Sequence, residues 1–259
     1  MRVSEARYEI EFEDDVLSER RWVPFYLPHW SSRELAAARY EVGEGQLRLL
    51  IESDQEPWCP ELDGEVRVSS LQTGVFAGPV GSKFGQHRFT PDAFVREAQE
   101  NVRLYTPRYG RIEMRAKATD DPRCMVALWM IGYEDEPERS AEICVCEIFG
   151  RDVSAERAFV GVGIHPFADP QITDDFSAEM VPIDAREFHV YAAEWTPEYV
   201  AFFIDGEHIK TVGQSPSYPM QLMLNLYEFP DATGDTFTAE TYPKEFVVDY
   251  VRGYKLVQG

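Results

Sequence analysis

The feature that most constrains the fold is the short-range alternation of apolar and polar residues along nearly the whole chain. A period of two residues predicts β-strands that bury one face. The alternating segments are bounded by clusters of Gly, Pro, Asp and Ser, as strands usually are. The predicted strands span residues 46–52, 110–118, 126–131, 142–149, 159–164, 187–195, 199–204, 208–212, 220–226 and 246–256.

Helical patterns are sparse by comparison. Only residues 31–38 and 91–100 predict short helices, the second with Thr90 in position to cap it. Asp205-Gly206 separates two strand segments and predicts a hairpin turn, because both residues tolerate a positive φ. Many strands without intervening helices predict an all-β, two-sheet antiparallel sandwich. With no repeat or linker in the sequence, we expect one domain over residues 1–259.

The composition limits the classes of molecule that the protein is expected to bind. The chain has 259 residues, enough for a substantial core, and 46 acidic against 25 basic residues give a net charge of −21. Such a surface repels phosphate backbones and anionic lipid, so we expect no nucleic-acid and no membrane partner. The sequence as written shows no signal peptide, which predicts a cytoplasmic protein, or a secreted one if a leader has been removed. Four cysteines are too few for a disulfide scaffold.

The segment 141–150 carries the candidate chemistry. It places Glu142 and Glu147 in an otherwise apolar strand, where a carboxylate is costly unless it faces a cleft. A spacing of five sends the two side chains to opposite faces of a regular strand, whereas a β-bulge would return them to the same face. The Cα atoms would then lie about 13 Å apart. Carboxyl groups leaning together from there can approach the roughly 5 to 5.5 Å that a retaining glycosidase requires.

The sequence resembles glycoside hydrolase family 16, the laminarinases, licheninases and their relatives. Residues 142–150, EICVCEIFG, match the family motif Glu-x-Asp-x-x-Glu in its two outer acids and in the following glycine. Further stretches resemble family motifs in the same order along the chain, at residues 109–115, 127–132, 188–191, 194–197, 203–206, 219–226 and 248–252. The first hundred residues match only loosely.

The resemblance implies a concanavalin A-like jelly roll with a glycan cleft on its concave sheet. It implies a retaining endo-glycosidase that hydrolyses a β-linked polysaccharide or oligosaccharide of the β-1,3- or mixed-linkage glucan class. Glu142 would be the nucleophile and Glu147 the general acid/base. A non-catalytic carbohydrate-binding protein on the same scaffold and a transglycosylase remain alternatives. We expect a monomer that requires no cofactor.

Cys144 departs from the family pattern, because it stands where the family has the middle Asp. A thiol is neutral at pH 7 and donates only weak hydrogen bonds. Losing a negative neighbour should leave Glu142 more readily ionised, loosen its orientation and weaken the retention of a proton on Glu147. We therefore expect slower or pH-shifted catalysis. Cys146 is expected to be a small buried filler.

Aromatic residues are candidates to bind the sugar. By resemblance, Trp129 would lie under the sugar next to the cleaved bond; the alternative is a tryptophan of the core. Trp58, in a proline-flanked loop, would be a platform on the cleft rim or else a loop anchor. His165 occupies a position where family members often have a sugar-contacting histidine, and a purely structural histidine is the alternative.

Further polar and aromatic candidates lie at the end of the predicted strand 220–226 and directly after it. Asn225 and Glu228 could form hydrogen bonds to sugar hydroxyls, and Tyr227 could stack on a sugar ring. For Glu228 a solvated surface acid is the competing interpretation.

A structural calcium ion is also implied by the resemblance, on the side away from the cleft. The matching positions are the side chain of Glu11, the backbone carbonyl of Gly45 and the side chain of Asp249. Oxygen ligands of this kind suit a hard cation. Salt-bridged surface acids would explain the two carboxylates equally well.

Overall fold

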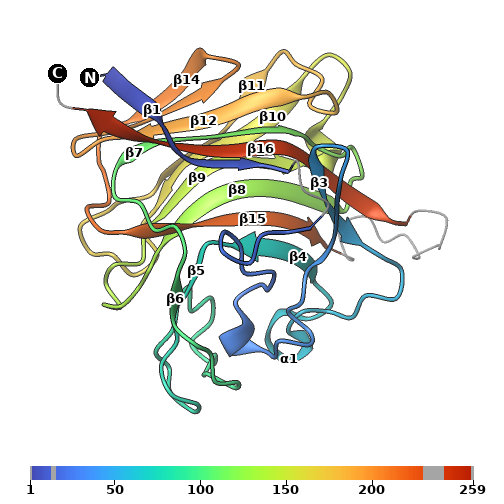
Figure 1. The fold of residues 1–259 in the computed structure, drawn as a ribbon, viewed down its shortest axis with the longest axis vertical. Helices are drawn as coiled ribbons and strands as arrows, with labels where there is room; N and C mark the ends of the chain where they lie inside the picture. Colours follow the sequence, from blue (N-terminus) through green and yellow to red (C-terminus); the bar gives the residue numbers. More distant parts are fainter. Residues whose placement is uncertain (1, 13–15, 230–241, 258–259) are drawn as a thin grey trace.

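The computed structural model describes residues 2–12, 16–229 and 242–257, with side chains from Phe12 to Leu256. It is a sandwich of two antiparallel sheets (Figure 1). The first has the order β14-β13-β12-β7-β16-β3-β2, with β1 pairing on β16. Its strands are β1 (Arg2–Glu11), β2 (Arg39–Gly43), β3 (Gln46–Ile51), β7 (Gly110–Lys117), β12 (His189–Trp195), β13 (Val200–Ile204), β14 (Glu207–Val212) and β16 (Lys244–Val257).

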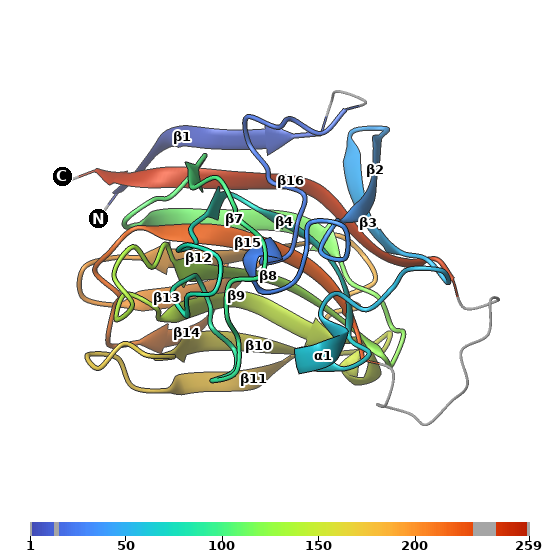
Figure 2. The same cartoon turned by 90° about the horizontal axis from the view of Figure 1, so that it is seen from below.

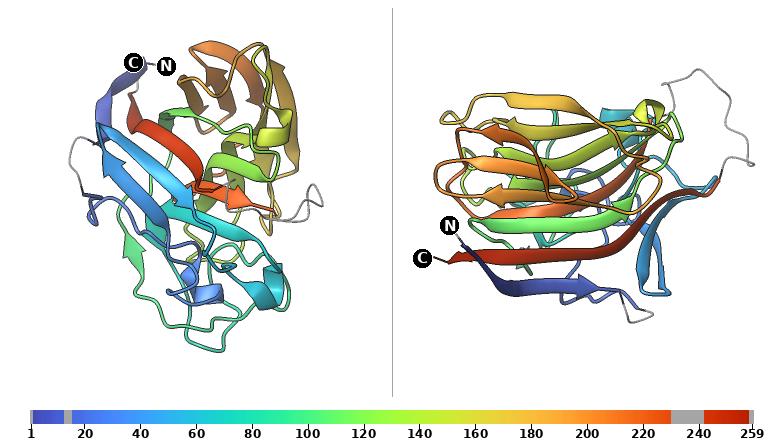
Figure 3. Two further views of the ribbon diagram at one scale, coloured as in Figure 1. Left: turned by 90° about the vertical axis from the view of Figure 1, so that its right-hand side faces the viewer. Right: turned by 90° about the horizontal axis from the view of Figure 1, so that it is seen from above.

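The second sheet has the order β11-β10-β9-β8-β15-β4. Its strands are β4 (Arg67–Gln72), β8 (Cys124–Gly132), β9 (Glu142–Phe149), β10 (Ala158–His165), β11 (Asp175–Val181) and β15 (Met220–Glu228). The remaining elements are the ribbon β5 (Gly74–Val75) with β6 (Val102–Arg103), the short helix α1 (Pro60–Asp63) and the 3-10 turns η1 (Pro28–Trp30) and η2 (Gly150–Asp152). Figure 2 shows β1 alongside β16 in the outer layer, and the two ends of the chain lie at one end of the sandwich (Figure 3).

The two sheets differ in how their strands are buried. In β7, buried and half-buried residues alternate strictly, as expected of a strand with one face on the core. All nine residues of β15 are buried, and β8 is nearly as enclosed. A second apolar cluster explains this, because residues from the first hundred, such as Tyr26, Trp30 and Val95, pack on the outer face of the second sheet. The loops that carry them gather with α1, β5 and β6 beyond β4 (Figure 1).

The predicted all-β sandwich is confirmed, and every predicted strand is present with bounds within three residues. The predicted hairpin turn is present too, with positive φ at Asp205 and Gly206. None of the described helices is long and apolar enough to cross a membrane.

The two predicted helices are wrong. Residues 31–38 form turns and residues 91–100 form an irregular loop. Ala36, Ala93 and Val95 of these segments are buried, whereas Phe94 is exposed. Segments this short gain little from intrinsic helix propensity, so packing onto the second sheet decides their conformation.

Candidate active site

A β-bulge in β9 sets the geometry of the site. Leu128 of β8 pairs with Cys146 of β9, but the next residue, Trp129, pairs with Cys144. Val145 is therefore the extra residue on the bulged strand. The register between β9 and β10 shifts at the same place.

The bulge sorts the side chains of β9 between two environments. Ile143, Val145, Cys146 and Ile148 belong to the core between the sheets. Cys144 belongs to the cluster on the outer face of the second sheet. Glu142 and Glu147 line one pocket of about 170 Å3 on that same outer face, together with Tyr26, His87, Met125, Ala127, Trp129 and Tyr227. The two glutamates thus share a pocket despite their odd spacing.

The two carboxyl groups have different surroundings. Glu142 is buried, and its Oε1 lies 3.1 Å from His87 Nδ1, although the geometry is not that of an aligned hydrogen bond. Burial raises the pKa of Glu147; a hydrogen bond from the Cys144 thiol opposes this shift, and the negative charge of Glu142 reinforces it. A raised pKa favours the protonated form that a general acid needs.

Cys144 is fully buried between the two acids. Burial, and then the charges of Glu147 and Glu142, raise the pKa of its thiol well above its usual range. The thiol is therefore neutral, and its hydrogen bond goes to Glu147. The sequence predicts that Cys144 acts mainly on Glu142, whereas in the structure the thiol contacts Glu147. Cys146 is buried in the core between the sheets, in the environment expected of a filler.

Tyr26 and His87 line the pocket but are not among the residues predicted from the sequence. His87 comes from the loop between β5 and β6, stacks on Phe167 with ring centroids 4.5 Å apart, and meets Trp129 edge-on at 5.0 Å. Its backbone N–H donates to Glu134 Oε1 at 2.6 Å. His87, Glu134 and Phe167 all have positive φ, a conformation that is strained for bulky residues and that concentrates at functional sites. No local sequence motif marks this histidine.

Trp129 and Asn225 act as a pair. Trp129 lines the pocket, and its indole N–H donates to Asn225 Oδ1 at 2.7 Å. Asn225 is fully buried, so the expected direct contact of Asn225 with sugar hydroxyls is wrong for this structure. It holds the indole in place instead.

Tyr227 and Trp58 have different positions relative to the pocket. Tyr227 lines it, with its hydroxyl 3.2 Å from that of Tyr26. Trp58 is 1% exposed, donates to Asp63 Oδ2 at 2.6 Å and packs against Tyr26 and Phe89. The prediction of a cleft-rim platform is therefore wrong, and Trp58 anchors its loop beneath the residues that line the pocket.

His165 and Glu228 lie outside the pocket lining. His165 pairs with Glu142 across the β9–β10 register, stacks on Phe176 and contacts Asp174 through Nδ1 at 2.6 Å. Glu228 is fully buried between Arg67 and Arg123 and accepts a hydrogen bond from the hydroxyl of Tyr242 at 2.8 Å. Neither a sugar-binding role nor a solvated surface position fits Glu228, because buried ion pairs occupy its carboxylate.

The backbone brings the predicted calcium ligands near one another. Glu11 pairs with Tyr250, the residue after Asp249, and Phe12 bridges to Gly45. The side chain of Glu11 lies outside the described part of the chain. The carboxylate of Asp249 is ion-paired with Arg115, a cation that would compete with calcium. No group of three potential ligand side chains occurs among the described residues, and the calcium site stays a prediction.

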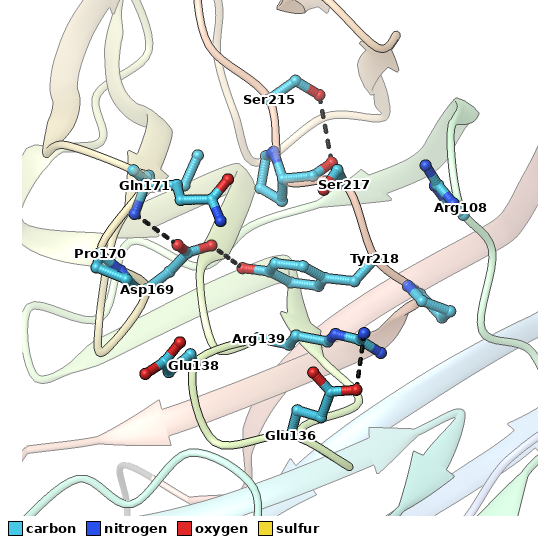
Figure 4. Close-up of a pocket in the computed structure, with 13 residues that line it drawn as sticks. Arg108, Glu136, Glu138, Arg139, Asp169, Pro170, Gln171, Ser215, Ser217 and Tyr218 are labelled. Carbon is cyan, nitrogen blue, oxygen red and sulfur yellow. Dashed lines mark hydrogen bonds and ion pairs between the residues drawn. The ribbon is translucent and has the colours of Figure 1, made fainter.

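A second pocket, of about 320 Å3, lies at the end of the second sheet where β15 begins (Figure 4). It contains none of the predicted site residues. Tyr218 points at Asp169 and donates to it at 2.6 Å, while the same hydroxyl accepts the N–H of Ala141, the residue before Glu142. This pair therefore fixes both the start of β9 and the loop that carries Phe167.

Two acids and a tryptophan in a pocket on one face of a jelly-roll sandwich define the general class of carbohydrate-active β-sandwich proteins. The family model of the glycosyl hydrolases family 16 matches residues 103–251, more than half of the chain. The chain belongs to this family, which confirms the resemblance seen in the sequence.

Curated relatives are glucanases. The β-glucanase of Rhodothermus marinus is 28% identical over 177 residues, 58% of this chain and 58% of the relative. The endo-1,3-1,4-β-glycanase EglC of Rhizobium meliloti is 30% identical over 151 residues, 57% of this chain and 30% of the relative. The matches thus span less than two thirds of either relative.

Solved structures extend the comparison to nearly the whole chain. The GlcNAcα1-4Gal releasing endo-β-galactosidase from Clostridium perfringens has a TM-score of 0.82 and 30% identity, covering 97% of this chain and 62% of that one. The laminarinase from Rhodothermus marinus has a TM-score of 0.66 and 22% identity, with 98% of each chain covered. The second likeness shows the shared fold.

Proposed function

We propose that this chain is a retaining endo-glycosidase that cleaves a β-linked glycan by double displacement. The observation that carries the proposal is the bulge at Val145, which directs Glu142 and Glu147 into one pocket. Their environments differ as the two roles require, since burial raises the pKa of Glu147 and a histidine nitrogen lies beside Glu142. Trp129 provides an aromatic surface in the same pocket.

In the first step, Glu147 donates its proton to the glycosidic oxygen while the Glu142 carboxylate attacks the anomeric carbon. The bond to the leaving sugar breaks, and an ester between Glu142 and the sugar forms. Glu147, now ionised, takes a proton from water. The water oxygen attacks the same carbon and releases Glu142 as a carboxylate. His87, whose Nδ1 lies 3.1 Å from Glu142 Oε1, is the side chain that we propose positions this carboxylate.

For the substrate we propose a glycan with internal β-galactosidic linkages. The endo-β-galactosidase of Clostridium perfringens supports this choice, because its likeness covers 97% of the chain at 30% identity. The laminarinase from Rhodothermus marinus covers as much of the chain, but at 22% identity and a TM-score of 0.66 against 0.82. A β-1,3- or mixed-linkage glucan is the second candidate, supported by the names of the curated relatives.

The test is a reducing-end assay of the full chain on β-galactan, agarose, carrageenan, laminarin and mixed-linkage glucan. We expect turnover on a galactan, retention of anomeric configuration by NMR, and a loss of at least about 10^4-fold in Glu142→Gln. Glu156→Gln, which changes an exposed acid, is the matched control and should retain full activity.

Other outcomes select the alternatives. Glucan turnover alone would replace the galactan by the second candidate. Longer products in the presence of acceptor sugars would indicate a transglycosylase. Binding of oligosaccharide without any turnover would indicate a carbohydrate-binding protein, and the double-displacement proposal would then be wrong.

A further inference from the structure

Beside the catalytic pocket lies a separate cavity of about 260 Å3. It is lined by Lys83, Phe84, Gly85, Arg88, Glu134, Pro137, Ser140, Phe167 and Ala168. Two of these residues are direct neighbours of His87, since Phe167 stacks on its ring and Glu134 accepts its backbone N–H. The cavity and the catalytic pocket therefore adjoin each other through His87, which lines the pocket and contacts these two residues.

Two cations of this cavity converge on one point. Lys83 Nζ donates to the carbonyl oxygen of Pro91 at 3.1 Å, and an Arg88 guanidinium nitrogen donates to the same oxygen at 3.0 Å. Two positive charges that share an acceptor lie close together and repel each other. Their shared acceptor, Pro91, is not part of the cavity lining and both hydrogen bonds are exposed, so an anion in the cavity would bind beside this carbonyl and relieve the repulsion.

Neither cation is neutralised by the protein in the described part of the chain. Other arginines of the same loop region have acidic partners, as Arg96 has Glu61 and Arg103 has Asp135. For Lys83 and Arg88 the described hydrogen bonds go to backbone carbonyls.

Glu134 is the acid that lines this cavity. Its carboxyl group is buried and already accepts the N–H of His87. Burial raises its pKa well above the usual range; the hydrogen bond from the His87 N–H opposes this shift, and the charge of Glu142 reinforces it. The raised pKa favours the protonated form of Glu134, which carries no charge and still forms hydrogen bonds.

We propose that this cavity is a subsite for an acidic sugar unit. Lys83 and Arg88 bind the sulfate or carboxylate group of that unit, and Phe84 and Phe167 pack against its sugar ring. The proposal rests on the proposed function, because it assigns the glycan unit next to the one that Glu142 and Glu147 act on. It narrows the substrate class to glycans that carry a negatively charged substituent. Binding through paired charge-assisted hydrogen bonds accounts for selectivity over neutral sugars.

The test measures binding rather than turnover. Full-length Glu142→Gln protein is titrated with galactose 6-sulfate against galactose, glucuronic acid against glucose, and inorganic sulfate, with NMR detection. We expect at least one acidic sugar to bind about tenfold or more tightly than its neutral counterpart, with a preference that weakens as sodium chloride is added. Comparing the two acidic sugars distinguishes a sulfate ester from a carboxylate.

The preference should vanish in Lys83→Gln/Arg88→Gln. Arg108→Gln is the matched control, since Arg108 lies over Tyr109 and lines the other pocket (Figure 4). A single variant separates the loss of charge from a loosened turn at Pro91. Arg88→Lys retains the positive charge and should keep part of the preference for acidic sugars.

Equal binding of acidic and neutral sugars, binding of inorganic sulfate alone, or a preference that survives the double substitution would overturn the proposal. Because the readout is binding to an inactive variant, a preference without turnover in the unmodified protein would support the subsite while contradicting the hydrolase.

Discussion

The strands of residues 103–251 and the loops of the first hundred residues contribute different parts of the same pocket. The strands supply Glu142, Glu147 and Trp129, and they coincide with the family match. The loops supply Tyr26 and His87 to this pocket, and Lys83 and Arg88 to the cavity beside it. Strand register fixes Glu142, Glu147 and Trp129, whereas loops add further lining residues, among them Phe167 from the later part of the chain. These two parts, the strand half and the loop half of the chain, build the pocket jointly.

The largest expected effect lies in the strand half. Glu147→Gln should lower kcat on a poor leaving group by about 10^3-fold, because general acid catalysis contributes 10^2 to 10^4-fold. Activated aryl glycosides, which need no proton on the leaving oxygen, should lose much less in the first step. Steady-state kinetics on both substrate types provides the measurement, and equal losses would contradict the assigned role. Glu179→Gln, on β11, serves as control.

The loop half should produce the next largest effect. His87→Ala removes the nitrogen 3.1 Å from Glu142 Oε1 and the ring between Phe167 and Trp129. We expect kcat to fall by about 10 to 100-fold through misplacement of the nucleophile, with a smaller change in KM. His208→Ala, at an exposed hairpin, is the control. If only KM changed, His87 would bind substrate rather than position Glu142.

A moderate effect is expected at Cys144, where the chain departs from its family. The fall of kcat/KM at high pH should follow deprotonation of Glu147, whose pKa is raised by burial and lowered by the Cys144 hydrogen bond. Cys144→Asp removes the thiol donor and adds a negative neighbour, and both changes raise the pKa of Glu147. The alkaline limb should move to higher pH by about one unit.

The pH profile of kcat/KM measures this shift. Cys144→Ser, which keeps a donor, should leave the limb near its original position. An unchanged profile in Cys144→Asp would show that residue 144 does not tune the pair of acids.

The smallest expected effect concerns the calcium ion predicted at the first sheet, with Glu11, Gly45 and Asp249 as its ligands. Saturating calcium should raise the Tm by a few degrees at most, because Arg115 already neutralises Asp249. Arg115→Gln should enlarge the shift, and Arg48→Gln, which breaks an exposed pair on β3, should not. A Tm insensitive to calcium and to a chelator in all three proteins would rule the ion out.

The strand half could be predicted from the sequence more fully than the loop half. The strand 142–149 and its two acids follow from the alternation, because polar residues in an apolar strand are costly without a cleft. The bulge was one of two possibilities, and the register with β8 selects it. For Trp58 the sequence left a rim platform and a loop anchor open, and burial against Tyr26 and Phe89 fits the anchor.

The sequence by itself determined the strands, the hairpin at Asp205-Gly206 and the two acids of β9, since these depend on neighbours along the chain. Only the tertiary structure decided which residues surround the acids. His87 and Phe167 meet because strained loops from distant parts of the chain converge on the second sheet, and Asn225 is buried on the outer face of that sheet, where its side chain accepts the indole N–H of Trp129. Such contacts come from packing and burial across long separations, which no local pattern records.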